Sequence, residues 1–200
     1  NVSVKMEDGT YWITPSGISK SFITPDKLLR VDAAMNVVEG PENYKPSSEM
    51  KMHMRCYELR DDVGAVVHAH PPAATGFAVA HLPMDRYILI EAVISLGSVP
   101  LTPFGVPSTK EVPDAIAPYL PDHDAMLLEN HGAVTVGADL CTAYYRMETL
   151  ELWAKIELNA RLLGGEKEIS EKNIGRLLEL RKSAKVTGRH PGYRHYRKNK

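Results

Sequence analysis

The chain has 200 residues with a formal net charge of −1, and 44% of them are hydrophobic, which suits one globular domain with a sizeable core. The balanced charge argues against a nucleic-acid-binding protein, and no apolar run approaches the roughly 18 residues that span a membrane. The first residues, NVSVKMEDGTYW, have neither the basic start nor the apolar core of a secretory signal. We therefore expect a cytoplasmic protein whose native chain begins before Asn1.

Predicted strands and predicted helices alternate along the chain. Short runs rich in β-branched residues and bounded by glycine or proline predict strands, at 1–5, 10–14, 65–70, 99–104, 125–130 and 132–137. Apolar residues at helical spacing predict helices, at 47–60, 71–81, 108–120, 139–165 and 170–185. Ser108 and Glu111 have the spacing of a capping box. The alternation predicts an α/β (α+β-like) fold, with helices covering a central sheet.

We expect one domain over residues 1–188 and a basic tail over 189–200. The tail is interpreted as a solvated end, or alternatively as a flap that closes over a charged ligand with Tyr193 or Tyr196. Two cysteines, Cys56 and Cys141, are too few for a cysteine-based zinc site and are interpreted as reduced core thiols.

Two imidazoles stand at the end of one predicted strand, in GAVVHAHPP at 64–72. Residues i and i+2 of a strand face the same side, so His68 and His70 project together. Each buried imidazole needs a polar partner, and two cannot easily be protonated side by side. A divalent metal ion resolves both difficulties because it binds neutral imidazole nitrogen. The pair alone leaves metal binding and ordinary core or surface histidines open.

A third imidazole, His131, lies in the turn between two apolar strands, in LLENHGAVTVG at 127–137. It is either a polar turn residue or a further ligand at the same sheet edge, and three histidines with a carboxylate or water are a common zinc arrangement. The other histidines stand singly and are interpreted as surface residues: His53, His81, His123, His190 and His195.

A carboxylate and two anion-binding segments complete the candidates. Glu49 follows two serines at a predicted helix start, where backbone N–H groups attract an anion, although a simple capping preference also places glutamate there. Ser16 and Gly17 form a tight turn that is either an anion nest or an ordinary turn. The sequence contains neither a P-loop nor a GxGxxG motif, so nucleotide binding has no support.

The strings NVSVK, ITPSGI, PSSE, VVHAHPP and ENHGAVTVG follow one another over about residues 1–165. Their order and spacing resemble the class II sugar-phosphate aldolases of the L-fuculose-1-phosphate aldolase type. The wider family includes L-ribulose-5-phosphate 4-epimerases, dehydratases and the adducin head domain. The resemblance implies a central, mostly antiparallel sheet flanked by helices. It also implies a homotetramer with sites at the subunit interfaces.

The resemblance further implies a zinc ion, with Mn²⁺, Co²⁺ or Fe²⁺ as alternatives, and a sugar-phosphate substrate. The implied metal ligands are Glu49, His68, His70 and His131, and Glu49 is also the implied catalytic acid and base. The implied phosphate-binding residues are Asn1, Ser16, Gly17, Ser47 and Ser48.

The activity that the resemblance favours is reversible, metal-dependent aldol cleavage of a ketose 1-phosphate to dihydroxyacetone phosphate and an aldehyde. The substrate would be similar to fuculose 1-phosphate or a deoxypentulose 1-phosphate. Glu49 favours an aldolase or a dehydratase because the epimerases have aspartate there. A dehydratase, decarboxylase or 4-epimerase of the same family is the alternative. One departure concerns the family's proton-donating tyrosine, whose place is taken by Leu89. Tyr87 and Glu91 are its nearest polar neighbours, so the proton donor is not assigned.

Overall fold

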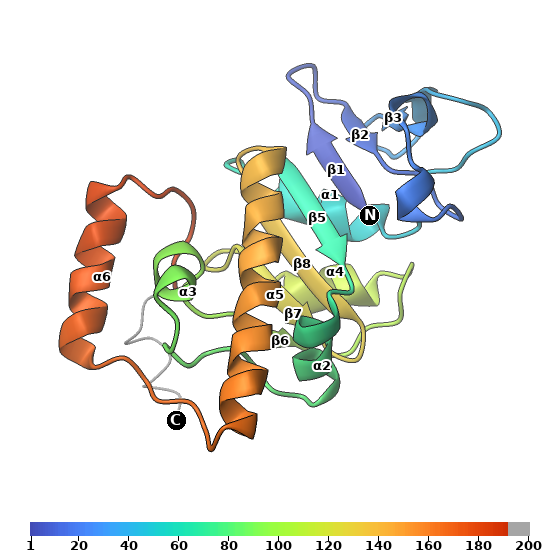
Figure 1. The fold of residues 1–200 in the computed structure, drawn as a ribbon. Coiled ribbons are helices and arrows are strands. Elements are labelled where there is room, and N and C mark those ends of the chain that lie inside the picture. Colours follow the sequence, from blue (N-terminus) through green and yellow to red (C-terminus); the bar gives the residue numbers. More distant parts are fainter. Residues whose placement is uncertain (192–200) are drawn as a thin grey trace.

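A central sheet of eight strands organises the computed structural model, which describes residues 1–191 (Figure 1). The strands lie in the order β4-β3-β2-β1-β5-β8-β7-β6, and every neighbouring pair is antiparallel except β6 with β7. Their bounds are β1 Val2–Lys5, β2 Tyr11–Ile13, β3 Leu29–Val31, β4 Val37–Glu39, β5 Ala65–Ala69, β6 Leu101–Thr102, β7 Ala125–Leu128 and β8 Gly132–Gly137. The predicted mostly antiparallel sheet is confirmed.

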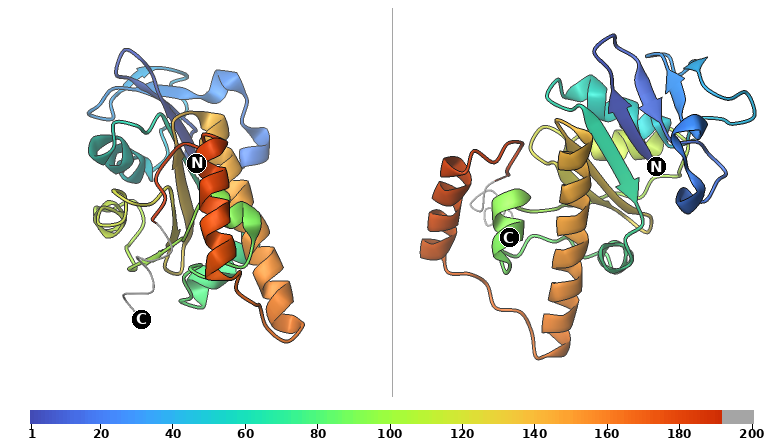
Figure 2. Two further views of the ribbon diagram at one scale, coloured as in Figure 1. Left: turned by 90° about the vertical axis from the view of Figure 1, so that its left-hand side faces the viewer. Right: turned by 45° about the horizontal axis from the view of Figure 1, so that its top comes forward.

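Helices cover both faces of this sheet, so the predicted arrangement is also confirmed (Figures 1 and 2). The α-helices are α1 Met50–Leu59, α2 Pro72–Val79, α3 Ile90–Ser95, α4 Glu111–Ile116, α5 Leu140–Leu162 and α6 Glu171–Ser183, and two short 3-10 helices are Lys20–Phe22 and Pro25–Lys27. The long helix α5 crosses one face together with α2, whereas α1 and α4 lie on the other. Helix α6 stands apart from the sheet and packs on α3.

The burial of the middle strands follows from their sequence. Successive side chains of β5 point to opposite faces, so Val66 joins the core under α1 and α4, while Ala65 and Val67 join the core under α2 and α5. A strand covered on both sides reads as a continuous apolar run rather than an alternating one, as AVVHA does. Strand β5, which leads to the two histidines, is therefore packed on both of its faces.

Several local predictions were wrong. The strand predicted at 99–104 is reduced to the two residues of β6, because Pro100 and Pro103 lack the N–H that a ladder needs. Strands β3 and β4 and helix α3 were not predicted. The expected capping box does not form: Ser108 has φ 67°, helix α4 begins at Glu111, and the Glu111 carboxylate accepts a hydrogen bond from the Val106 amide.

Burial also corrects three assignments of single residues. Cys56 is a buried free thiol as predicted, but Cys141 is exposed on α5. His53 and His123 are buried rather than on the surface, because His53 faces Ser3 and Asn1 and the His123 ring is hydrogen-bonded to the Tyr119 carbonyl, contacts that local sequence does not reveal. His195, Tyr193 and Tyr196 belong to residues 192–200 and lie outside the described residues. Among described residues, none of the helices is long and apolar enough to cross a membrane.

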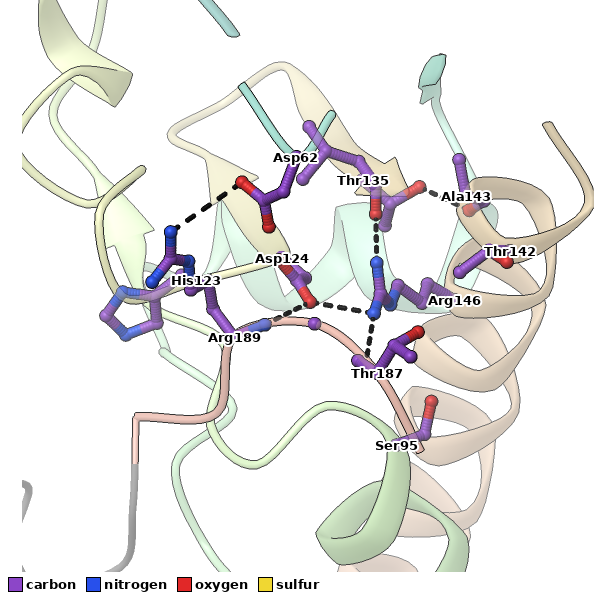
Figure 3. Close-up of polar contacts among 12 residues, drawn as sticks. Asp62, Ser95, His123, Asp124, Thr135, Thr142, Ala143, Arg146, Thr187 and Arg189 are labelled. Carbon is purple, nitrogen blue, oxygen red and sulfur yellow. Dashed lines mark hydrogen bonds and ion pairs between the residues drawn. The ribbon is translucent and has the colours of Figure 1, made fainter. Parts of the chain in front are cut away.

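A buried ion network ties the end of the described chain to the sheet (Figure 3). Asp124, directly before β7, pairs through Oδ1 with Arg60 Nη1 at 2.6 Å and through Oδ2 with Arg146 Nη2 at 2.8 Å. The backbone N–H of Arg189 donates to the same Oδ2 at 2.8 Å, and Arg146 also donates to the Thr187 carbonyl. This network lies at the opposite end of β7 from His131, so it anchors residues 187–189 rather than contributing to the candidate site described below.

Candidate active site

Three imidazoles meet at the edge of the sheet where β5 ends and β8 begins. His68 is in β5, His70 follows that strand directly, and His131 precedes β8, which pairs with β5 through Ala69 and Ala133. Ligand nitrogens of the three rings all lie within 4.8 Å of one another. The ring centroids are 4.7 Å apart for His68 and His131, and 5.0 Å apart for each of the other two pairs. Histidines 63 residues apart in the chain thus form one cluster.

The turn that carries His131 depends on unusual backbone positions. Asn130 adopts φ 55°, a left-handed conformation that asparagine tolerates better than most residues, and the His131 amide closes the turn on the Leu128 carbonyl. Gly132 then leaves space for the neighbouring strand: a Cβ here would lie 2.6 Å from the Ala69 carbonyl oxygen and 2.6 Å from His70 Cδ2. The absence of a side chain at 132 lets the three rings approach.

The first imidazole is held in a defined tautomer. His68 Nδ1 lies 2.9 Å from the Ala133 carbonyl oxygen, which can only accept, so Nδ1 carries the hydrogen and Nε2 keeps its lone pair. Burial and then His131 hold the pKa of His68 well below its usual range. Burial also lowers the pKa of His70, with a further contribution from His131, while the charge of Glu49 opposes this shift. His68 and His70 are therefore set up as neutral imidazoles.

These residues fit a divalent cation. Two nitrogen ligands at about 2.1 Å from a tetrahedral ion are separated by about 3.4 Å, and His68 Nε2 lies 3.2 Å from His70 Nε2. The buried Nδ1 of His131 has no hydrogen-bond partner among the described residues, so its polar capacity is unused by the protein. Neutral imidazole nitrogens at this spacing can hold zinc or another divalent transition metal.

Glu49 lies beside the histidines but outside the 4.8 Å cluster. It is the N-cap residue of α1 and is almost completely buried. Its Oε1 accepts a hydrogen bond from the Ser108 amide at 3.0 Å, and the left-handed φ of Ser108 directs that amide. The charge of Glu49 nevertheless acts on His70, which places the carboxylate near the cluster. Its role as a metal ligand stays a prediction.

The predicted phosphate-binding residues come from three segments that the structure places side by side. The backbone of Asn1 exchanges hydrogen bonds with His68 at 2.8 and 2.9 Å, so the start of β1 adjoins the histidine edge. Ser16 donates its amide to the Lys45 carbonyl and Ser47 donates its amide to the Thr14 carbonyl, which pairs the two serine-containing loops. Ser48 and the turn glycine Gly17, with φ 72°, are exposed nearby in the same two loops.

Two side chains at this site were not anticipated. Lys20 places its ammonium group 3.4 Å from the Pro15 carbonyl, beside the loop of Ser16. Glu151 of α5 accepts hydrogen bonds from the Ala73 amide at 3.1 Å and the Ala74 amide at 3.0 Å. Because Pro71 and Pro72 have no N–H, these amides are the first free donors of α2, and Glu151 caps the helix that follows His70. The only signal in the sequence is the proline pair, which does not say where an acceptor will come from.

Tyr87 does not replace the family's proton-donating tyrosine, whose place in this sequence is taken by Leu89. Helix α3 begins one residue after Leu89, which is its N-cap. Tyr87 is only 1% exposed and packs with Val93 and Ile174 of α6. Glu91 is exposed in the first turn of α3. The proton donor therefore stays unassigned.

The combination of this fold with a three-histidine cluster has counterparts among known proteins. Residues 1–158 match the family model described as class II aldolase and adducin N-terminal domain. The chain belongs to this family.

Named relatives fall among its aldolases. An L-fuculose phosphate aldolase from Methanococcus vannielii is 33% identical over 156 residues, covering 78% of this chain and 82% of the relative. A 5-deoxy-D-ribulose 1-phosphate aldolase from Bacillus thuringiensis serovar kurstaki is 31% identical over 180 residues, covering 88% and 82%. A solved L-fuculose 1-phosphate aldolase superimposes with a TM-score of 0.81 at 30% identity, covering 90% of this chain and 84% of that one.

Proposed function

We propose that this protein catalyses the reversible aldol cleavage of a ketose 1-phosphate to dihydroxyacetone phosphate and an aldehyde. The observation that carries the proposal is the cluster of His68, His70 and His131, with the backbone of Asn1 hydrogen-bonded to His68, in a chain of the class II aldolase family. The names of the relatives in the comparisons support a ketose 1-phosphate as the substrate class.

The three histidines would hold a divalent cation, zinc by default, with Glu49 as the fourth ligand or close beside it. When bound, such an ion supplies Lewis-acid stabilisation for negative charge on the substrate's carbonyl and neighbouring hydroxyl oxygens. The chain's own contribution begins with tautomer control, because the Ala133 carbonyl keeps the hydrogen of His68 on Nδ1 and leaves Nε2 free to bind. Gly132 contributes the space in which His70 stands.

Glu49 would move the proton at the carbon next to the carbonyl. Its carboxylate is nearly buried and anchored by the Ser108 amide through one oxygen, so the second oxygen is available. A base in this position needs only one free oxygen within hydrogen-bond reach of the carbon-bound proton.

The phosphate would be bound by the loops of Ser16 and Gly17 and of Ser47 and Ser48, together with the side-chain amide of Asn1. Hydroxyls and backbone N–H groups at a helix start are a common phosphate site, and helix α1 begins directly after Glu49. The ammonium group of Lys20 would add a full positive charge at the rim. Phosphate binding far from the bond that breaks would position the reacting carbons.

We further propose that the protein acts in the cytoplasm as a homotetramer with this site near a subunit interface. The unassigned proton donor supports such an assembly, because a neighbouring copy could complete the site. Residues 1–188 form the proposed single domain, followed by the tail.

One assay tests the reaction. Purified protein is incubated with L-fuculose 1-phosphate, 5-deoxy-D-ribulose 1-phosphate and other ketose 1-phosphates, and released dihydroxyacetone phosphate is measured with a coupled dehydrogenase. We expect release from at least one substrate, loss of release with a chelator, and recovery with added Zn²⁺. The variants His68→Ala and His131→Ala should lose bound metal and activity together, by more than roughly 100-fold.

The alternative is a dehydratase, decarboxylase or epimerase of the same family, which would use the same histidines. These reactions release water or carbon dioxide or invert one carbon, but produce no dihydroxyacetone phosphate. If a sugar phosphate is consumed in a metal-dependent way without dihydroxyacetone phosphate, the aldolase proposal is wrong and the alternative replaces it.

A further inference from the structure

A chain of four polar side chains runs beneath the proposed phosphate site, from α1 to the start of β1. His53 Nε2 lies 2.6 Å from Asn1 Oδ1, and His53 Nδ1 lies 2.7 Å from Ser3 Oγ. The same Ser3 Oγ lies 2.7 Å from the Tyr57 hydroxyl. His53 and Tyr57 are one helical turn apart on α1, while Ser3 lies in β1 and Asn1 directly precedes this strand. All but Asn1 are buried, and His53 is completely so.

A head-to-tail series of hydrogen bonds through these four side chains can run in two directions, because His53 is neutral. Burial lowers the pKa of His53 to about 3, so one ring nitrogen carries a hydrogen and the other accepts. In one direction, Tyr57 donates to Ser3, Ser3 donates to His53 Nδ1, and His53 Nε2–H donates to Asn1 Oδ1. In the other direction every donor and acceptor is exchanged, and the Asn1 NH₂ group donates to His53.

Tyr57 decides between these directions. In the first direction its O–H hydrogen is used on Ser3 Oγ, and all four groups are satisfied. In the second direction Ser3 donates to Tyr57, and the phenol hydrogen is left without an acceptor, since Ser3 is the only side-chain partner of the Tyr57 hydroxyl within residues 1–191. The backbone amide of Val66, which also acts on this phenol, is a donor and cannot accept its hydrogen. If Tyr57 and His53 Nδ1–H both donated to Ser3 Oγ, the Ser3 hydrogen would instead lack an acceptor among residues 1–191. A buried unsatisfied hydroxyl is costly, so the first direction is preferred.

We propose that His53 is a positioning residue that holds the side-chain amide of Asn1 with its oxygen inward and its NH₂ group toward the phosphate of the substrate. This inference rests on the proposed function, in which Asn1 binds phosphate. With the oxygen held by His53, Asn1 presents two N–H donors to a dianion. The opposite orientation would present a carbonyl oxygen and repel it. The buried hydrogen-bonded side chains thus determine that the NH₂ group of Asn1, and not its carbonyl oxygen, faces the phosphate.

The first test reads the tautomer directly in the unmodified protein. Long-range ¹H–¹⁵N correlation spectra of the imidazole of His53 are recorded between pH 5.5 and 8. We expect a neutral ring with its hydrogen on Nε2 throughout this range. A ring with its hydrogen on Nδ1, or a protonated ring, overturns the inference. This measurement requires neither a variant nor an assay of the reaction.

The second test uses phosphate itself. The variant His53→Leu removes the donor to Asn1, whereas His53→Gln keeps an N–H near the position of Nε2. We expect the dissociation constant for inorganic phosphate to rise roughly 10-fold in His53→Leu and to stay within about 2-fold in His53→Gln. The same order should hold for KM, with kcat changed less. Met54→Leu, which alters the next buried residue of α1, controls for general packing effects and should leave phosphate binding unchanged.

The outcomes separate this inference from the proposed function. If no ketose 1-phosphate releases dihydroxyacetone phosphate but the tautomer and phosphate results are as expected, the reaction is wrong and the role of His53 stands. If cleavage occurs but His53→Leu binds phosphate as tightly as the unmodified protein, the role of His53 is wrong. Should His53→Leu fail to fold, the tautomer spectrum together with His53→Gln still decides.

Discussion

The substitution Gly132→Ala tests whether the missing side chain at 132 allows the histidines to meet. The added Cβ would lie 2.6 Å from the Ala69 carbonyl oxygen and from His70 Cδ2, about 0.8 Å closer than ordinary van der Waals contact at 3.4 Å. One of these atoms belongs to the backbone of β5, so strands β5 and β8 must separate locally. Overpacking of this kind costs about 1–3 kcal/mol.

The displacement should affect metal binding more than folding. Metal ligands must stay within about 0.2 Å of their ideal distances, and the shift required at His70 is several times larger. We expect Gly132→Ala to unfold at a lower urea concentration and to bind Zn²⁺ roughly 10- to 100-fold more weakly. Urea unfolding of the metal-free protein measures the first effect, and competition with a coloured chelator measures the second.

Gly76→Ala is the matched control. Gly76 lies within α2, where an added Cβ meets nothing within 4 Å, so this substitution should stabilise the protein by about 0.5–1 kcal/mol and leave Zn²⁺ binding unchanged. The explanation for Gly132 fails if its alanine variant binds Zn²⁺ as tightly as the unmodified protein. It also fails if both alanine variants weaken binding equally.

Three further predictions concern Glu49, His53 and Glu151. Glu49→Gln should keep much of the metal, measured by elemental analysis, but lose turnover, and normal turnover would exclude Glu49 as the base. The pKa of His53 is near 3 in the folded protein and 6.5 in the unfolded chain. The neutral, buried ring therefore makes its full contribution to folding stability above pH 6.5, and this contribution is lost as pH falls toward 3. Urea unfolding of metal-free protein should show a loss of about 1.4 kcal/mol per pH unit from this group, absent in His53→Gln. An equal slope in both proteins would contradict this. Glu151→Ala should cost about 1 kcal/mol in the same measurement because α2 loses its cap, whereas Glu151→Gln should cost less. Equal losses would argue against the cap.

Much of the candidate site could be predicted because it depends on short-range geometry. The two-residue spacing of His68 and His70 requires only that their segment be a strand. The apolar runs on either side of His131 likewise indicate a hairpin turn. The order of the motifs, in turn, was enough to predict the family, the mostly antiparallel sheet and the helices that flank it.

Other features were missed because their cause lies far away in the chain. The surface assignment of His53 was wrong because helical periodicity does not reveal that Ser3 and Asn1 lie against its ring. The capping box at Ser108 did not form because that segment turns instead to present an amide to Glu49, 59 residues earlier. The strand at 99–104 was overextended because the prolines at 100 and 103 permit pairing over only two residues.

The sequence by itself determined which residue types stand at strand ends, at turns and at helix starts, since these preferences act over a few neighbouring residues. Only the tertiary structure decided that β5 pairs with β8 in the register that brings Ala69 opposite Ala133 and so gathers the three imidazoles. It also decided that Glu151 caps α2 and that His53 faces Asn1. Strand register and helix docking are settled by the burial of a common core, and that energy depends on all the packed elements together.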